Sequence, residues 1–157
     1  DNSKSKNIEA SLFMYLYQKG HSPITSHITI FGKNECDCIS ISKSDYIYEY
    51  EIKISRADFK KDFTKIKHTN IINENYTKVR KGETFYLLPN YFNFVTPRDL
   101  IKLEEVPDYA GLIFMDEDGS FEVMRKPKLL HNTKANTLFI RKVAHNLTCK
   151  LIFKKIV

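Results

Sequence analysis

Two short segments of the chain, 35–37 and 49–53, carry ionisable side chains whose spacing suits chemistry on a phosphate. A polar turn separates them, so together they are typical of a β-hairpin. Folding this hairpin about Ser44 places Asp37 opposite Glu51 and Glu35 opposite Lys53. Two carboxylates that face each other destabilise a sheet unless a cation lies between them. Because Mg²⁺ binds carboxylate, water and phosphate oxygens, this pair with a nearby lysine favours metal-assisted attack on a phosphodiester.

This interpretation depends on the register of the hairpin. A slip by one residue would move Asp37 and Glu51 to opposite faces of the sheet. The alternative is a solvent-facing pair of strands that carries ordinary surface charge. A three-residue turn is a common hairpin connection and favours the first interpretation.

The composition predicts a single domain over residues 1–157. The chain is 42% hydrophobic and 13% aromatic, which is typical of a globular protein with a real core. No segment has the roughly 18 consecutive apolar residues of a membrane span, and the first residues lack the apolar core of a secretion signal. These features predict a cytoplasmic protein without a membrane partner.

The three cysteines, Cys36, Cys38 and Cys149, form an odd set, and the first two alternate along a strand instead of forming a Cys-x-x-Cys motif. Reduced, partly buried thiols are the favoured interpretation. A zinc site made of Cys36, Cys38 and His27 is the alternative.

The net charge of +6 is concentrated at the C-terminal end. From residue 126 onward there are eight Lys or Arg residues and no Asp or Glu, whereas 99–122 is acidic. Such asymmetry predicts one surface that attracts a polyanion and another that repels it. The alternative is a basic tail that aids solubility or contacts an acidic protein.

The remaining pattern predicts helices and strands in alternation. We expect helices over about 7–19 and 134–147, strands over 28–31, 35–42, 46–54, 84–88 and 91–95, and a helix capped by Ser55. Thr96-Pro97 predicts the start of a short helix that ends near Glu105, and 116–119 predicts a turn between two strands. Residues 68–83 form a polar excursion that is long enough to be a binding loop, a lid or partly helical. The order of these helices and strands along the chain predicts an α/β fold with a central mixed sheet flanked by helices.

Basic residues accumulate in three of these segments and would bind a polyanion, which the resemblance described below implies is DNA. The helix after Ser55 would bury Phe59, Phe63 and Ile66 and turn its lysines to solvent. The expected DNA-binding residues are Lys60, Lys61, Lys65, Lys67, Lys78, Arg80, Lys81, Arg141 and Lys142. Because phosphate neutralisation releases counterions, such binding should weaken steeply with salt. Tyr46, Tyr48 and Tyr50 fall on the other face of their strand, where packing is favoured over base stacking.

The chain resembles the PD-(D/E)XK phosphodiesterase superfamily, which has the restriction-endonuclease-like fold. The resemblance spans roughly 7–125 and rests on a helix with an early glutamate, Glu9, a strand with Asp37, a strand with Glu51-Ile52-Lys53, and a following helix. The segments 48–59 and 109–113 look particularly like small bacterial and phage proteins grouped with the MmcB-like DNA repair proteins. Cys36 stands where the motif has proline, and Glu49 adds a second acid on the face of Glu51.

The resemblance implies a site and an activity. Asp37, Glu51 and the main-chain carbonyl of Ile52 would bind Mg²⁺ or Mn²⁺, which would lower the pKa of a water and neutralise the phosphate. Lys53 would orient or deprotonate that water. Glu9 would act through a water on the metal or by holding Lys53; its simpler role is to stabilise a helix N-terminus. Glu49 could share metal ligation.

The function predicted on this basis is metal-dependent hydrolysis of DNA, as an endonuclease in DNA repair, recombination or phage DNA processing. Superfamily members that cut both strands are often dimers, so a homodimer fits this activity. The first alternative is a DNA-binding protein of the same fold without catalysis. The second is a phage-encoded interaction module whose basic tail binds an acidic protein. His68 and His131 have no partner that the sequence identifies.

Overall fold

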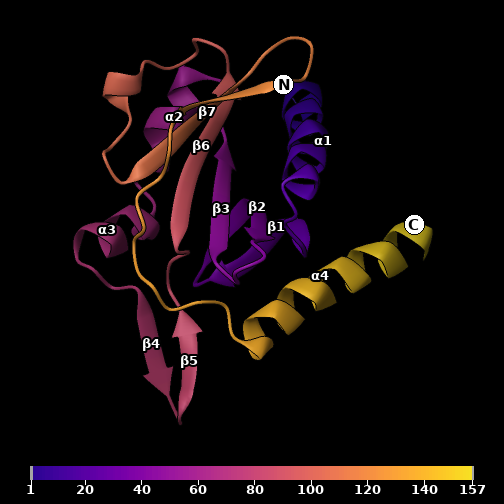
Figure 1. The fold of residues 1–157 in the computed structure, drawn as a ribbon, viewed down its shortest axis with the longest axis vertical. Coiled ribbons are helices and arrows are strands. Elements are labelled where there is room, and N and C mark those ends of the chain that lie inside the picture. Colours follow the sequence, from indigo (N-terminus) through magenta and orange to yellow (C-terminus); the bar gives the residue numbers. More distant parts are fainter. Residues whose placement is uncertain (1, 157) are drawn as a thin grey trace.

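The computed structural model describes residues 2–156 and is built around a six-stranded sheet with the order β1-β2-β3-β6-β7-β8 (Figure 1). The strands are β1 Ile24–Phe31, β2 Asn34–Ile41, β3 Ile47–Ile52, β6 Tyr91–Pro97, β7 Ala110–Met115 and β8 Phe121–Arg125. β1, β2 and β3 pair antiparallel, β3, β6 and β7 pair parallel, and β8 returns antiparallel. The predicted fold class, a mixed sheet flanked by helices, is confirmed.

Side chains of β3 alternate between the two faces of the sheet and define both. The acid face carries Ile47, Glu49 and Glu51, and the tyrosine face carries Tyr48, Tyr50 and Ile52. We use these two names throughout. Strand β6 extends both faces, because Tyr48 lies beside Tyr91 and Glu49 lies beside Phe92 in the parallel register.

Helix α1, Asn2–Gln18, covers the tyrosine face. Its residues Ile8, Leu12 and Leu16 recur every fourth position and are at most 1% exposed. They pack against Tyr50 of β3 and Val95 of β6. The predicted amphipathic helix is confirmed, and it begins several residues earlier than expected.

Three helices cover the acid face: α2 Arg56–Asp62, α3 Ile66–Ile72 and α4 Thr137–Ile156. The predicted cap of α2 is present, since the Ser55 hydroxyl accepts a hydrogen bond from the Asp58 amide at 3.1 Å. Phe139 and Val143 anchor α4 in the core, Asn146 and Lys150 still form hydrogen bonds with Thr25 of β1, and the C-terminal end of the helix lies beyond the sheet (Figure 1).

A second, two-stranded sheet is formed by β4 Thr77–Arg80 and β5 Glu83–Tyr86. This hairpin projects beyond the end of the main sheet, near the start of α4 (Figure 1). The Tyr86 hydroxyl links the two parts, because it donates to the Lys134 carbonyl at 2.5 Å and accepts from the Asn136 amide at 3.1 Å. The polar excursion 68–83 therefore contains most of α3 and β4 instead of a long irregular loop.

Two predicted helices differ from the structure for identifiable reasons. The chain breaks helicity between Asp62 and Ile66, so the expected single helix after Ser55 becomes α2 and α3, and Ile66 is 52% exposed instead of buried. Thr96 and Pro97 continue β6, because they pair in register with Phe114 and Met115 of β7. Only a 3₁₀ turn, Leu103–Glu105, remains of the helix predicted there.

The predicted hairpin turn at 116–119 is confirmed between β7 and β8. Within residues 2–156, no helix has both the length and the apolar character that crossing a membrane requires.

Candidate functional site

The hairpin register brings Asp37 and Glu51 together. Cys38 pairs with Tyr50 and Ile41 with Ile47, which is the predicted register. Beyond Cys38 the Asp37 carboxylate itself accepts the Ile52 amide hydrogen bond at 2.8 Å, and it lies within hydrogen-bonding reach of the Glu51 carboxyl. The two acids therefore converge, as the sequence predicted.

Lysine side chains lie between the acids. Lys67 of α3 forms ion pairs with both Glu49 and Glu51, and Lys65 lies 3.3 Å from the Glu51 carboxylate. Both glutamates are only 1% exposed, and Lys67 is 5% exposed. Ammonium groups of the same chain thus neutralise Glu49 and Glu51, but within residues 2–156 neither lysine forms an ion pair with Asp37, the acid that was expected to share a cation with Glu51.

Lys53 reaches the same cluster from the end of β3. Its ammonium lies 2.9 Å from Asp62 and 3.7 Å from Glu51. Asp62 is fully buried and also lies 2.8 Å from Lys65. The expected pairing of Lys53 with Glu35 is wrong, because the β2–β3 ladder ends at Cys38 and Tyr50 and Lys53 turns toward α2 instead.

A buried histidine extends the cluster toward β7. The His68 ring shares hydrogen bonds with the Asp62 carboxylate at 2.6 Å and with the Tyr109 hydroxyl at 2.7 Å. Sequence reasoning missed all three residues and left His68 without a partner. Asp62 is an isolated acid in a lysine-rich segment, and this could have marked it as a buried ion-pair partner. Its hydrogen bond with His68 could not be predicted, because it depends on the break between α2 and α3.

The pKa values of the acids differ strongly across the cluster. Burial and the adjacent Glu51 charge raise the pKa of Asp37 to about 7. Burial also raises the pKa of Glu49, to about 7, although Lys67 opposes this shift. Burial acts in the same direction on Glu51, but the Lys67 and Lys65 ammonium groups outweigh it and hold the pKa of Glu51 below its usual range.

Asp62 and Lys67 are the most strongly ionised members. Burial opposes ionisation of Asp62, yet the hydrogen bond from His68 and the charges of Lys53 and Lys67 hold its pKa far below the usual range. The pKa of Lys67 is raised despite burial, because Glu49 and Glu51 face it. The cluster therefore contains fixed ion pairs, and within residues 2–156 Asp37 is the acid of this cluster that has no ammonium group at ion-pair distance.

Glu9 lies in a separate ion group. Its carboxylate is 3.0 Å from the Nε2 atom of His27, whose Nδ1 atom is 3.3 Å from Glu35. The structure thus joins Asp37, Glu51 and Lys53, whereas Glu9 pairs at the edge of the sheet. Its predicted role of holding Lys53 is taken by Asp62.

The predicted DNA-binding residues divide into exposed and buried groups. Those that are exposed are Lys60, Lys61, Lys78, Arg80, Lys81, Arg141 and Lys142. Lys67 is buried, and Lys65 points to Glu51 and Asp62, so their prediction as solvent-facing residues of one helix is wrong. The break after α2 turns both side chains inward.

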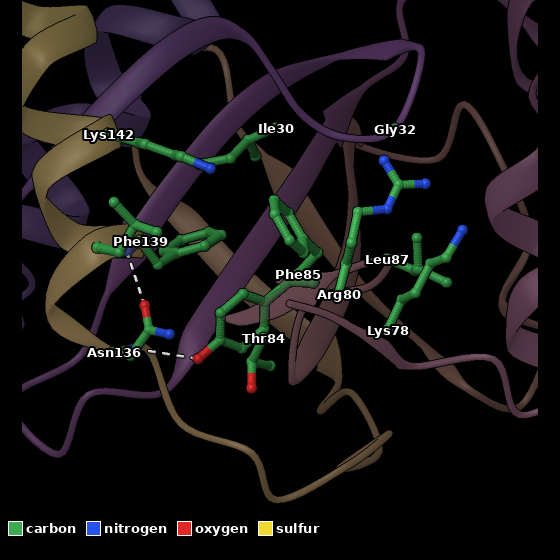
Figure 2. Close-up of a pocket in the computed structure, with 12 residues that line it drawn as sticks. Ile30, Gly32, Lys78, Arg80, Thr84, Phe85, Leu87, Asn136, Phe139 and Lys142 are labelled. Atoms are coloured by element: carbon green, nitrogen blue, oxygen red, sulfur yellow. Dashed lines mark hydrogen bonds between the residues drawn. The ribbon is translucent and has the colours of Figure 1, made fainter. Parts of the chain in front are cut away.

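Several exposed cations meet at a cavity of about 240 Å³ between the β4–β5 hairpin and α4. Figure 2 shows Lys78 and Arg80 from β4 and Lys142 from α4 around this cavity, with Phe85 between them. The Lys142 ammonium lies 5.3 Å from the centre of the Phe85 ring. Aromatic and cationic groups together suit a polyanion such as single-stranded nucleic acid.

The cysteines do not form the alternative zinc site with His27. Cys36 packs on the acid face beside Ile39, Cys38 packs on the tyrosine face beside Leu12, and His27 binds the two glutamates at the sheet edge. Both thiols are buried and free. Across residues 2–156, no group of three or more His, Cys, Asp or Glu side chains is arranged to hold a metal ion.

The donor chemistry at Asp37 and Glu51 nevertheless fits a hard divalent cation. Burial and the Glu51 charge raise the pKa of Asp37, and a divalent cation between the two carboxylates would relieve their repulsion. One Glu51 oxygen faces Lys67, which is buried, and the other faces Lys65, whose side chain is 30% exposed. Metal ligation by Glu51 therefore requires Lys65 to move toward solvent.

Comparison with known proteins adds evidence on the fold. No protein family profile and no curated protein sequence matches the chain. A solved structure of a protein of unknown function from Silicibacter pomeroyi is similar, with a TM-score of 0.63 and 18% sequence identity over 87% of this chain and 80% of that one. At this identity the likeness concerns the fold alone.

Proposed function

We propose that this protein is a metal-dependent nuclease that hydrolyses DNA phosphodiester bonds. One observation carries the proposal: Asp37, Glu51 and Lys53 converge on the acid face where the β2–β3 ladder ends. Two carboxylates can hold a divalent cation and a nearby lysine can stabilise phosphate charge, so this set of groups suits metal-assisted phosphoryl transfer. Membership of the PD-(D/E)XK superfamily is part of this proposal, and the order of a helix, three antiparallel strands, helices and a parallel strand supports it.

In this proposal Asp37 and Glu51 hold Mg²⁺ or Mn²⁺. The bound ion would activate a water and neutralise charge on the scissile phosphate. Lys53 would stabilise charge that develops on the phosphate, and Asp62 would position the Lys53 ammonium through their 2.9 Å ion pair. Lys65 would leave Glu51 when the site is loaded and could then bind a substrate phosphate.

DNA would approach along the exposed cations. Lys60 and Lys61 lie on α2 next to the acid cluster, and the hairpin and α4 supply the cavity of Figure 2. These groups would bind phosphates irrespective of sequence. Cleavage of both strands would need two sites, for which a homodimer is the proposed assembly.

The ion pairs of Lys65 and Lys67 with Glu51 favour a second candidate function, a DNA-binding protein without catalysis. In such a protein Lys67 and Lys65 would replace the metal permanently, and the cluster would serve stability alone. Burial of Glu49 and Glu51 is consistent with that role.

Cleavage of supercoiled plasmid and of single-stranded DNA separates the two candidates. We expect nicking with Mg²⁺ or Mn²⁺ that EDTA abolishes, and a loss of about 100-fold or more in Glu51→Gln and Lys53→Met. Glu35→Gln is the matched control, because Glu35 lies on β2 but pairs with His27 away from the cluster. Normal cleavage by Glu51→Gln would refute the assignment. Salt-sensitive DNA binding without any metal-dependent cleavage would establish the second candidate.

A further inference from the structure

A cavity of about 380 Å³ opens on the tyrosine face, on the other side of the sheet from the acid cluster. It lies beside the C-terminal end of α1 and is bordered by the segment that follows β8. The residues that line it are Tyr15, Lys19, Tyr48, Tyr50, Tyr91, Asn93, Ile113, Val123, Lys126 and Pro127. Its volume is within the range of about 300–1,000 Å³ that is typical of small-molecule sites.

Aromatic rings form one wall of this cavity. The Tyr48 and Tyr91 rings stack at 4.6 Å with an interplanar angle of 20°, and the Tyr50 ring lies nearly parallel to Tyr48 at 6.4 Å. The parallel register of β3 and β6 fixes this row, since Tyr48 lies beside Tyr91. Tyr48 and Tyr91 are only partly buried, but each ring covers one face of the other, so a further ring packs against the outside of this pair and not on both rings at once.

The floor of the cavity carries a nearly buried amide. Asn93 is 2% exposed, and it lines the cavity. Gly111 on β7 makes room for it, because a β-carbon at that position would lie 2.1 Å from the Asn93 Oδ1 atom. Amide side chains bind the hydrogen-bonding edges of bases, so Asn93 is the group in this cavity that can bind a base edge.

Positive charge lies at the rim. Lys19 and Lys126 are exposed, and the lining residues include no Asp or Glu. The Lys19 ammonium lies 4.5 Å from the centre of the Tyr15 ring, at the mouth of the cavity. The two lysines therefore attract an anion to the cavity that the tyrosine rings and the Asn93 amide line.

We propose that this cavity binds a nucleotide: the base packs against the outside of the pair formed by the Tyr48 and Tyr91 rings, the Asn93 amide binds the base edge, and Lys19 and Lys126 bind the phosphate. The ligand can be a free nucleotide or one unit of a single-stranded nucleic acid, since both present the same base and phosphate. A proline-rich peptide would use the rings but would leave the amide and the lysines without a role. The site lies on the face opposite Glu51, so it stands independently of the proposed nuclease activity.

NMR titration of the full ¹⁵N-labelled chain tests the proposal. The probes are the four ribonucleoside 5′-monophosphates, oligo(dA) and oligo(dT) hexamers, and decaproline as a competitor class. We expect nucleotides to shift the Asn93 side-chain amide and the Tyr48 and Tyr91 backbone signals. Tighter binding of a hexamer than of a monophosphate assigns the site to single-stranded nucleic acid, and equal binding assigns it to free nucleotides.

Substitutions of residues that line the cavity test whether the nucleotide binds there. Tyr48→Leu and Asn93→Ala should each weaken nucleotide binding about tenfold, while Tyr17→Leu, a matched change at a 70% exposed tyrosine of α1, should leave it unchanged. Lys126→Glu changes only the exposed rim and should weaken binding even if a core variant fails to fold. Absence of any shift at millimolar nucleotide, binding of decaproline alone, or unchanged affinity in folded Tyr48→Leu and Lys126→Glu would overturn the proposal.

Discussion

The two faces of β3 show how one strand supports two different environments. On the acid face Glu49 and Glu51 are almost fully buried and are stabilised by Lys67, whereas on the tyrosine face Tyr48 and Tyr50 pack against rings and aliphatic side chains. Removing one partner of a buried ion pair leaves an uncompensated charge and is strongly destabilising. Substituting one buried apolar or aromatic side chain by another of similar volume usually costs much less. The acid face should therefore respond to single substitutions and to pH far more than the tyrosine face.

Removal of the Lys67 ammonium should have the largest effect. Lys67→Ala leaves Glu49 and Glu51 buried without their main cation, so we expect the free energy of unfolding to fall by about 3–5 kcal/mol. Urea denaturation at pH 7 measures this loss. Lys60→Ala, an exposed lysine of α2, should change stability by about 0.5 kcal/mol or less. Equal effects of the two substitutions would contradict the contrast between the faces.

Asp37 should make stability depend on pH. Its pKa rises from 3.8 to about 7 on folding, so the folded state binds the proton more tightly. That contribution is complete below the unfolded pKa and is lost as the pH rises through about 7. Relative to Asp37→Asn, the wild-type protein should therefore lose up to about 1.4 kcal/mol per pH unit between these two pKa values.

Urea denaturation of both proteins at pH 4, 5, 6, 7 and 8 checks this prediction. A difference in stability that stays constant across the series would show that Asp37 has a normal pKa in the folded protein.

The smallest effect is expected on the tyrosine face. Tyr48→Leu removes the stack with Tyr91 and should cost about 0.5–1.5 kcal/mol. Burial raises the pKa of Tyr48 above 10, so its hydroxyl stays neutral and the loss should be the same at pH 5 and pH 8. Thermal unfolding at both pH values is the measurement. A loss that varies with pH would contradict this expectation and would point to His21, whose ring lies 4.9 Å from that of Tyr48.

The hairpin was predictable because local rules determine it. Alternation along both strands and the short turn set the register, and Asp45 adopts a φ of 66° that the turn requires. The acid pair followed directly from that register. The capped start of α2 was also local, since the Ser55 side chain binds an amide only three residues away.

Long-range contacts determined what the sequence could not predict. The break after Asp62 places Lys65 and Lys67 against Glu51, which no helical periodicity indicates. Glu9 was predicted to belong to the metal site because of its position in the first helix. In the structure it pairs with His27, whose unusual backbone φ of 52° in β1 the sequence does not indicate. The link from Asp62 through His68 likewise appears only when the two short helices are in place.

The carboxylate of Asp62 has a consequence for any substrate. It contacts Lys53, Lys65 and His68 at once, and it is fully buried. An anion that reaches Lys53 must compete with the Asp62 carboxylate for the Lys53 ammonium group. If the proposed phosphodiester site is correct, it should therefore favour a multiply charged anion over a singly charged one, because only the former gains enough at Lys53 to displace the Asp62 carboxylate.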